Sequence, residues 1–234
     1  MTLIIGLVVV GLLLVVGLAV LAHRAAQKRR EAFAALAVSK GWTYAVDDDR
    51  WVQAFDGAPF GLGHGRSAGN VLTGSSGNRP FVAFDYSYRT TETSTDAQGH
   101  TSTHEETHTF SVCALQVSCT FPDLHVRPEN FLSRAVGHLT NRDIELESEA
   151  FNRAFTVTCS DRKFASDVLH PRQMEMLLAH THLDWRFDRD WVLSVSTRTL
   201  RPEEVEPSLG VVGALVDNIP DFVWQDHAGP AAHG

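Results

Sequence analysis

The apolar run at the start of the chain constrains this protein more than any other feature. Residues 2–22 read TLIIGLVVVGLLLVVGLAVLA and contain no charged side chain. At about 1.5 Å per residue they form roughly 32 Å of helix, enough to cross a hydrocarbon core about 30 Å thick. A core helix of a soluble protein usually keeps one polar face, and this run has none. The sequence therefore predicts a transmembrane helix at 2–22, with the lipid bilayer as its partner.

A cleaved signal peptide is the alternative, because residues 20–22 (VLA) are similar to a cleavage site. Signal peptides place a basic residue before a shorter apolar region of about 7–15 residues. Here the basic residues follow the run, at Arg24, Lys28, Arg29 and Arg30. Such clusters stay on the cytoplasmic side of a membrane. We therefore expect an uncleaved single-pass anchor in the cell membrane, with the N-terminus outside and the C-terminal domain cytoplasmic.

Residues 23–40 predict a basic juxtamembrane helix that continues the anchor. The segment is rich in Ala, Lys, Arg and Glu, which are good helix formers, and Gly41 follows where a helix C-terminal cap belongs. Phe33, Leu36 and Ala37 form its apolar stripe. The four basic residues named above either contact anionic lipid headgroups or serve only to set the topology.

The rest of the chain predicts a soluble α+β domain at 41–226, followed by a flexible tail at 227–234. A hydrophobic content of 44% is enough for a packed core. Without the four basic residues near the anchor, 16 Lys and Arg stand against 28 Asp and Glu, a formal charge of −12. An acidic domain repels phosphates, so we expect no nucleic-acid binding. Cys113, Cys119 and Cys159 are an odd number without zinc-site spacing, so we expect three reduced thiols, with the first two in one strand.

Periodicity and turn residues predict the elements of this domain. We expect short strands joined by tight turns over 57–77, and a polar hairpin tip over 90–103. Phe84, Tyr86 and Tyr88 should share one face of a strand, with Phe81 on the other. The remaining expected strands are 42–46, 80–89, 107–117, 144–147, 154–159, 183–187 and 191–196, and the expected helices are 128–139, 161–168, 171–180 and 202–218. Together they indicate one domain with a mainly antiparallel sheet.

The motif His104-Glu105-Glu106-Thr107-His108 matches the HExxH pattern of zinc proteases. That pattern needs a helix, which brings both histidines to one metal. Here Ser and Thr surround it and it leads into a strand, where the histidines would lie about 13 Å apart. With His100, they fit a solvated hairpin tip better than a metal site or a pH sensor. Residues 63–68 fit a relaxed GxGxxA pattern, which we interpret as turns. We assign no catalytic, cofactor-binding or metal residue and expect no cofactor.

From Phe81 to Leu178 the sequence resembles an uncharacterised family of actinobacterial single-pass membrane proteins, a domain of unknown function. The resemblance lies in residues 84–86 (FDY) with Tyr88, 143–148 (DIELES), 151–157 (FNRAFTV), 161–165 (DRKFA), 169–171 (LHP) with Met174 and Glu175, and 219–220 (IP). It implies a membrane-attached bacterial domain of this size and brings no assigned activity. By their physical properties alone, the same residues predict a strand, a helix capped by Asp161 and a second helix that begins at Pro171.

These observations favour a membrane-anchored, non-catalytic interaction or scaffold module over an enzyme. Two alternatives stay open. One is a metal-dependent hydrolase that uses the His-rich segment at 104–108. The other is a lipid or small-ligand sensor at the membrane surface.

Overall fold

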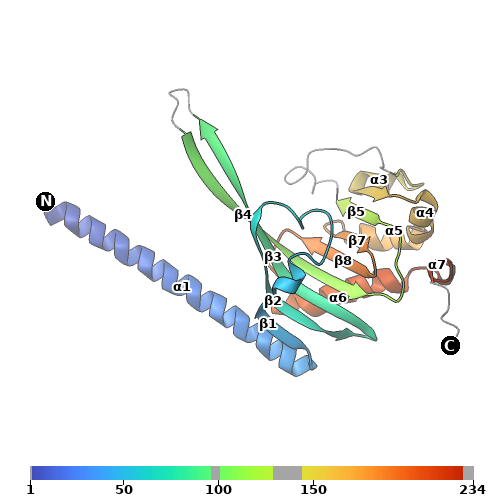
Figure 1. Cartoon of the computed structure of the whole chain (residues 1–234), viewed down its shortest axis with the longest axis horizontal. Helices are drawn as coiled ribbons and strands as arrows, with labels where there is room; N and C mark the ends of the chain where they lie inside the picture. Colours follow the sequence, from blue (N-terminus) through green and yellow to red (C-terminus); the bar gives the residue numbers. More distant parts are fainter. Residues whose placement is uncertain (1, 96–100, 129–143, 229–234) are drawn as a thin grey trace.

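The computed structural model describes residues 2–95, 101–128 and 144–228. A long helix leads into a domain built on an eight-stranded sheet, with most of the helices gathered on one face (Figure 1). The strand order is β1-β2-β3-β4-β8-β7-β5-β6, and every neighbouring pair is antiparallel. The predicted α+β class is confirmed.

The N-terminal helix α1 (Thr2–Lys40) is continuous through the predicted span and the juxtamembrane segment. It ends at Lys40, and the next residue, Gly41, has a positive φ of 68°, which suits a residue without Cβ. The predicted stripe is confirmed, because Phe33 and Ala37 are buried against the sheet and Leu36 packs beside them. Within the described residues, one helix has the length and composition to span a membrane, and its apolar window has no buried residue.

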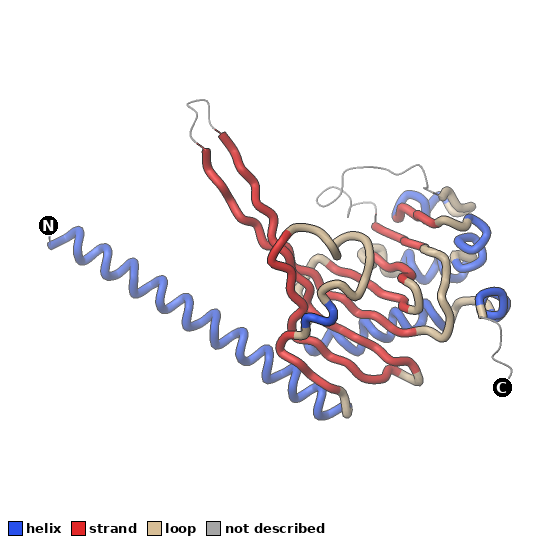
Figure 2. The backbone as a smooth tube through the Cα atoms, in the orientation of Figure 1, coloured by secondary structure: helices blue, strands red, loops and turns tan. Residues whose placement is uncertain are grey.

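The strands form a sheet with two very different ends (Figure 2). One end consists of β1 (Thr43–Asp47), β2 (His64–Ser76) and the long hairpin of β3 (Arg79–Thr95) and β4 (Thr101–Gln116). The other consists of β8 (Trp191–Ser196), β7 (Asp184–Asp188), β5 (Leu124–Pro128) and β6 (Phe155–Cys159). The register pairs Phe81 with Leu115 and continues to Thr95 opposite Thr101.

Two hydrophobic clusters cover the two faces of the sheet. The larger contains Phe81, Ala83 and Leu115 and is covered by the end of α1 and by α6 (Pro202–Asp217). Shorter helices complete this layer: α3 (Glu149–Ala154), α4 (Arg162–Val168), α5 (Pro171–Leu178) and α7 (Asp221–His227). The smaller cluster contains Phe84, Tyr86 and Tyr88, under the 3-10 helix η1 (Asp49–Trp51) and the segment that follows it. The predicted division of these aromatic residues between the two faces is confirmed.

Several predicted elements are confirmed for the predicted reasons. Asp161 caps α4 by accepting a hydrogen bond from the Phe164 amide, and Pro171 opens α5. Strands β1, β6, β7 and β8 and helix α6 lie within a few residues of their expected positions.

The prediction of short strands joined by tight turns over 57–77 is confirmed for 57–63, which form turns and bends, and was wrong for 64–76, which form one strand, β2. Its irregularities are bulges, with register shifts between His64 and Ser67 and between Gly69 and Leu72. Gly74 is required for packing rather than for a turn, since a Cβ there would lie 2.5 Å from the Trp42 ring. The predicted tip at 90–103 was also wrong: β3 continues to Thr95 and β4 begins at Thr101. Threonine is β-branched and favours strands, although its polarity is typical of loops.

Other corrections concern the second half of the chain. Pro128 ends strand β5 instead of opening a helix, and the rest of the predicted helix 128–139 lies outside the described residues. Residues 144–147 form no strand, although the Ile144 amide donates a hydrogen bond to the Val157 carbonyl at 2.9 Å. Cys119 lies beyond the end of β4, outside the strand that holds Cys113. The predicted tail falls largely outside the described residues.

Candidate functional site

The junction between α1 and the sheet joins the predicted anchor to the domain. Arg29 and Asp85 form a two-pronged ion pair, with Nη1 to Oδ2 at 2.7 Å and Nη2 to Oδ1 at 3.0 Å. Arg29 Nε also donates to the Leu200 carbonyl at 3.1 Å. A planar guanidinium that meets a carboxylate through two nitrogens fixes orientation as well as distance. Arg29 therefore fixes the helix on the domain, whereas Arg24, Lys28 and Arg30 are exposed.

Asp85 is the buried centre of this junction, with 9% of its surface exposed. Besides Arg29, it accepts hydrogen bonds from the Leu200 amide and from Asn70 Nδ2, both at 2.8 Å. Asn70, in turn, accepts a hydrogen bond from the Tyr44 hydroxyl at 2.9 Å. A buried carboxylate is stable only when its oxygens are satisfied in this way. Asp85 of β3 therefore connects α1, β2 and the segment just before α6, and Asn70 extends the network to β1.

Further contacts hold the last turns of α1 in place. The ring of Phe33 stacks on Tyr44 with 6.1 Å between centroids, and the Arg29 guanidinium lies 5.1 Å from the Phe33 centroid. At the end of the helix, Lys40 pairs with Glu206 of α6 at 2.7 Å. The helix is therefore docked from Arg29 to Lys40 by the Arg29–Asp85 pair, by ring packing and by the Lys40–Glu206 pair together.

The hairpin of β3 and β4 extends beyond the domain as a bare two-stranded ribbon, which we call the arm (Figure 1). We define the arm as residues 89–95 and 101–107. Its side chains are exposed, apart from the partly buried Thr90 and from Thr95, whose side chain is not described. The ladder continues along the arm in register, for example Glu92 opposite His104 and Thr93 opposite Thr103. An isolated two-stranded ribbon is marginally stable, so its residues gain little from folding as such.

The base of the arm is tied to the domain by polar contacts. Glu105 accepts from His64 Nε2 at 3.2 Å and pairs with Arg89 at 3.4 Å. The His64 hydrogen bond and the Arg89 charge hold the pKa of the Glu105 carboxyl below its ordinary value. His108 stacks on Tyr88 with 4.8 Å between ring centroids and contacts Thr90 Oγ1 at 2.8 Å.

The HExxH motif lies within β4, on the arm. Because the chain is extended there, His104 and His108 are separated by about 13 Å along the strand, too far to hold one ion. His108 is already engaged by Thr90 and Tyr88. Among the described residues, no group of three His, Cys, Asp or Glu side chains is placed to hold a metal.

A second candidate is a cavity of about 150 Å³ between the sheet and α6. Its lining includes Cys113, His182 and Ser208, residue types that occur in nucleophilic sites. Burial, however, raises the pKa of the Cys113 thiol to about 12. A catalytic thiol needs the opposite shift, because the thiolate is the nucleophile. Cys113 is therefore a protonated core residue at neutral pH.

A third candidate is a row of buried charges on β7, beside a cavity of about 280 Å³. Asp184, Arg186 and Asp188 alternate along the strand and are all at least 94% buried. Their partners show what they do: Arg186 Nη1 donates to the Ala58 carbonyl at 2.7 Å, and Asp188 accepts from the Asp56 amide at 2.6 Å. Arg186 and Asp188 therefore fasten the segment after η1 over the sheet.

His125 lies next to this row and contacts Asp184 Oδ1 at 2.7 Å. Burial lowers the pKa of His125 below its ordinary value, although the Asp184 charge acts in the opposite direction. The imidazole is therefore neutral at physiological pH, and Nε2 is the donor to Asp184.

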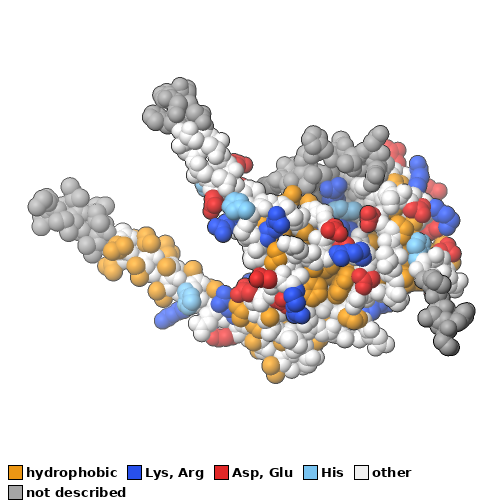
Figure 3. Space-filling view, in the orientation of Figure 1, with side chains coloured by type: hydrophobic (Ala, Val, Ile, Leu, Met, Phe, Trp, Pro, Cys, Tyr) orange, Lys and Arg blue, Asp and Glu red, His pale blue; other side chains and the backbone are white. Residues whose placement is uncertain are grey.

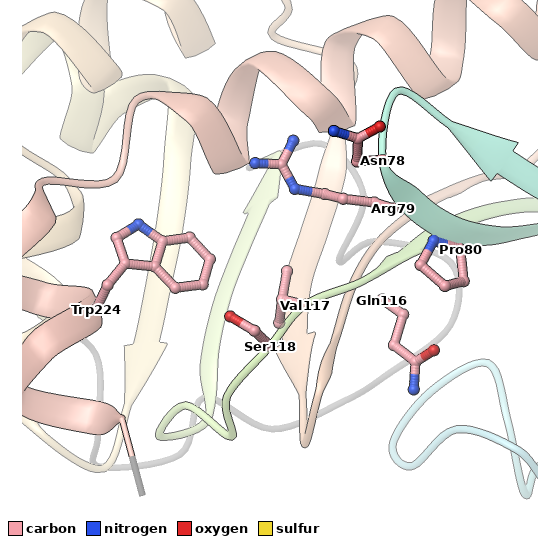
Figure 4. A pocket seen from close by; sticks show the side chains of 7 residues that line it. All are labelled: Asn78, Arg79, Pro80, Gln116, Val117, Ser118 and Trp224. Carbon is pink, nitrogen blue, oxygen red and sulfur yellow. The ribbon is translucent and has the colours of Figure 1, made fainter. Parts of the chain in front are cut away.

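The largest of these hollows is an open one of about 370 Å³ at the turn between β2 and β3 (Figure 4). It is lined by Asn78, Arg79, Gln116 and Trp224, among others. Two of its polar groups have partners: Arg79 pairs with Asp217 at 2.8 Å, and Gln116 donates to Asp190 at 2.8 Å. Because its arginine and its glutamine already have partners, we assign the hollow no ligand.

Sequence reasoning did not find the Arg29–Asp85 junction or the arm. Asp85 lies in a strand whose neighbours alternate aromatic and polar residues, so it reads as a solvent-facing position. The signal in the sequence was that Asp85 lies on the same strand face as Phe81 and Ala83, which are buried. A carboxylate on a buried face needs a buried partner.

No family model and no curated protein matches this sequence. One solved structure is similar, the crystal structure of the mycobacterial trehalose monomycolate transport factor A, TtfA. The two share 16% identity with a TM-score of 0.58, over 84% of this chain and 97% of that one. At this identity the likeness concerns the fold. Its mycobacterial source is compatible with the actinobacterial resemblance noted in the sequence.

Proposed function

We propose that this protein is a membrane-anchored, non-catalytic interaction module that faces the cytoplasm and assists a lipid-transporting membrane protein. The observation that carries the proposal is the docking of α1 through Arg29 and Asp85. A domain that needs only to be kept near a membrane is served by a flexible linker. Here the helix runs into the domain without a break, so the domain has a set orientation relative to its anchor.

The chemistry of the described residues supports a module without catalysis. The thiol in the cavity below α6 is protonated, the buried charges on β7 fasten a loop, and the HExxH motif is extended. The lipid-transport part of the proposal is supported by the fold shared with a transport factor. The cytoplasmic orientation is supported by the basic residues that follow the apolar run.

Complementation of a deletion strain tests this function. Loss of the gene should cause a lipid to accumulate on the cytoplasmic side of the membrane, and the full chain should reverse the accumulation. Replacing residues 2–22 with an unrelated single-span anchor should preserve rescue, because the anchor acts as a tether. An unchanged lipid distribution in the deletion strain would contradict the role in lipid transport.

A reporter fused after Gly234 tests the orientation. We expect activity from a reporter that works only in the cytoplasm and none from one that works only outside. The reverse result would overturn the cytoplasmic assignment, while membrane fractionation of the same fusions would still report whether the chain is anchored.

A further inference from the structure

The arm is long enough to reach the level at which α1 enters the membrane. The Arg29–Asp85 ion pair joins α1 to β3, so the lengths of the helix and of the strand can be measured from the same level. Seven residues separate Arg29 from Ala22, the predicted end of the span, or about 10 Å of helix. Ten residues separate Asp85 from Thr95, or about 33 Å of strand. Figure 1 shows the arm leaving the domain on the side toward which the N-terminus of α1 points.

Lipid is a poor environment for this ribbon. Its described side chains are mainly Thr, Ser, Glu and His, and Figure 3 shows them in contrast with the hydrophobic side chains of α1. Strands with open edges do not occur in the hydrocarbon region unless protein or water covers them. Over residues 90–94 and 102–109, the described strand pairing runs only between β3 and β4, so each outer edge meets no further strand. The arm therefore needs polar surroundings at the membrane surface.

Charge distinguishes between the available partners. The arm has three carboxylates, Glu92, Glu105 and Glu106, against one arginine, Arg89. Glu105 is paired at the base, whereas Glu92 and Glu106 form no ion pair with any described residue. Both lie on the same face of the ribbon, since Glu92 is opposite His104 and Glu106 opposite Thr90. An acidic ribbon is repelled by anionic headgroups and by the arm of a second copy.

Cytoplasmic segments of membrane proteins have the complementary charge, because Lys and Arg are concentrated there. We propose that the arm docks on a Lys/Arg-rich cytoplasmic segment of an integral membrane protein that lies beside α1. The open strand edges provide backbone donors and acceptors for an extended segment, and the carboxylates select a basic one. The inference rests on the proposed function, whose membrane partner it describes more closely.

Site-specific photo-crosslinking in native membranes tests the proposal with the full chain. A crosslinking amino acid at Thr93 should react with one integral membrane protein, within a Lys/Arg-rich cytoplasmic segment mapped by mass spectrometry. The variant E92K/E106K should lower the yield at least tenfold. The control E145K/E147K makes the same charge change at exposed residues that form no ion pair among those described. It should leave the yield unchanged, and all variants should keep the wild-type melting temperature.

Four results would overturn the inference: crosslinks to lipid, crosslinks to a second copy of the chain, crosslinks only to soluble proteins, or no product above that of a crosslinker at Glu147. Full chain reconstituted in vesicles with and without phosphatidylglycerol provides the lipid reference, and we expect no added lipid crosslink with the anionic lipid.

The two proposals fail separately. A basic segment mapped on a protein unrelated to lipids would support the docking of the arm and contradict the role in lipid transport. A lipid phenotype that E92K/E106K rescues fully would support the role in lipid transport and contradict the docking of the arm.

Discussion

The two halves of the β3–β4 hairpin differ in burial: one half lies in the core and the other is exposed. From Phe81 to Tyr88, β3 is buried on both faces apart from the partly exposed Ser87, and its side chains build both hydrophobic clusters. Beyond the partly buried Thr90 the same strand continues, with the same partner in the same register, and its described side chains are exposed. Folding explains the first half. Burial does not explain the second, and for this half we propose a partner outside the chain.

The strongest test of this contrast replaces matched residues in the two halves. Phe84 is fully buried beside Phe55 and Trp51, so Phe84→Ala should lower the free energy of unfolding by about 3–5 kcal/mol. Thr93 is exposed, so Thr93→Ala should change it by no more than about 0.5 kcal/mol. Urea unfolding in mild detergent measures both. Comparable losses would mean that the arm is part of the folded core.

The junction that orients α1 should give the next largest effect. Asp85→Ala leaves the Arg29 guanidinium and the Leu200 amide without their partner, which should cost about 3 kcal/mol of stability. Spin labels on α1 and β6 should also show a broader distance distribution. Asp217→Ala is the control. The Asp217 side chain, which pairs with Arg79, is 64% exposed, so this pair should contribute less than about 1 kcal/mol. An unchanged distance distribution in Asp85→Ala would show that packing alone orients the helix.

Acidity should affect the body of the domain more than the arm. Burial lowers the pKa of His125 in the folded state. As the pH falls below 6.5, His125 is therefore protonated in the unfolded chain before it is protonated in the folded chain. The contribution of His125 to stability is therefore present above pH 6.5 and is lost as the pH falls through its folded pKa. Unfolding free energies between pH 7.5 and pH 5 should decline less steeply in His125→Gln. His104→Gln, on the exposed arm, should keep the wild-type slope.

Removal of the whole arm should have only a small effect on stability. Thr90 and Glu106 lie directly opposite each other, so deleting residues 91–105 and joining the ends with Asn-Gly closes a two-residue turn. We expect the melting temperature to stay within about 4–8 °C of the wild type, which corresponds to roughly 1 kcal/mol in a small domain. Rescue of the deletion strain should be lost. A shortened chain that rescues fully would show the arm to be dispensable.

The sequence predicted the parts of this protein whose pattern is local. The length of the apolar run, the Asp161 cap and the proline that opens α5 each act within a few residues. The arm was missed because threonine combines loop polarity with strand geometry, and pairing with the opposite strand decides between them. The junction was missed because Arg29 and Asp85 are 56 residues apart. Nothing local distinguishes an arginine that contacts lipid from one that docks on a buried carboxylate.

The central claim is that the docked helix holds the arm at the membrane surface. The most direct test places a spin label at position 93 of the full chain, with Cys119 and Cys159 replaced by Ala, in nanodiscs that contain nickel-chelating headgroups. Relaxation of the label by nickel should be strong at position 93 and weak at position 147, which lies beside α3 at the far end of the domain. Asp85→Ala should weaken the effect at position 93. Equal relaxation at positions 93 and 147 would contradict the account.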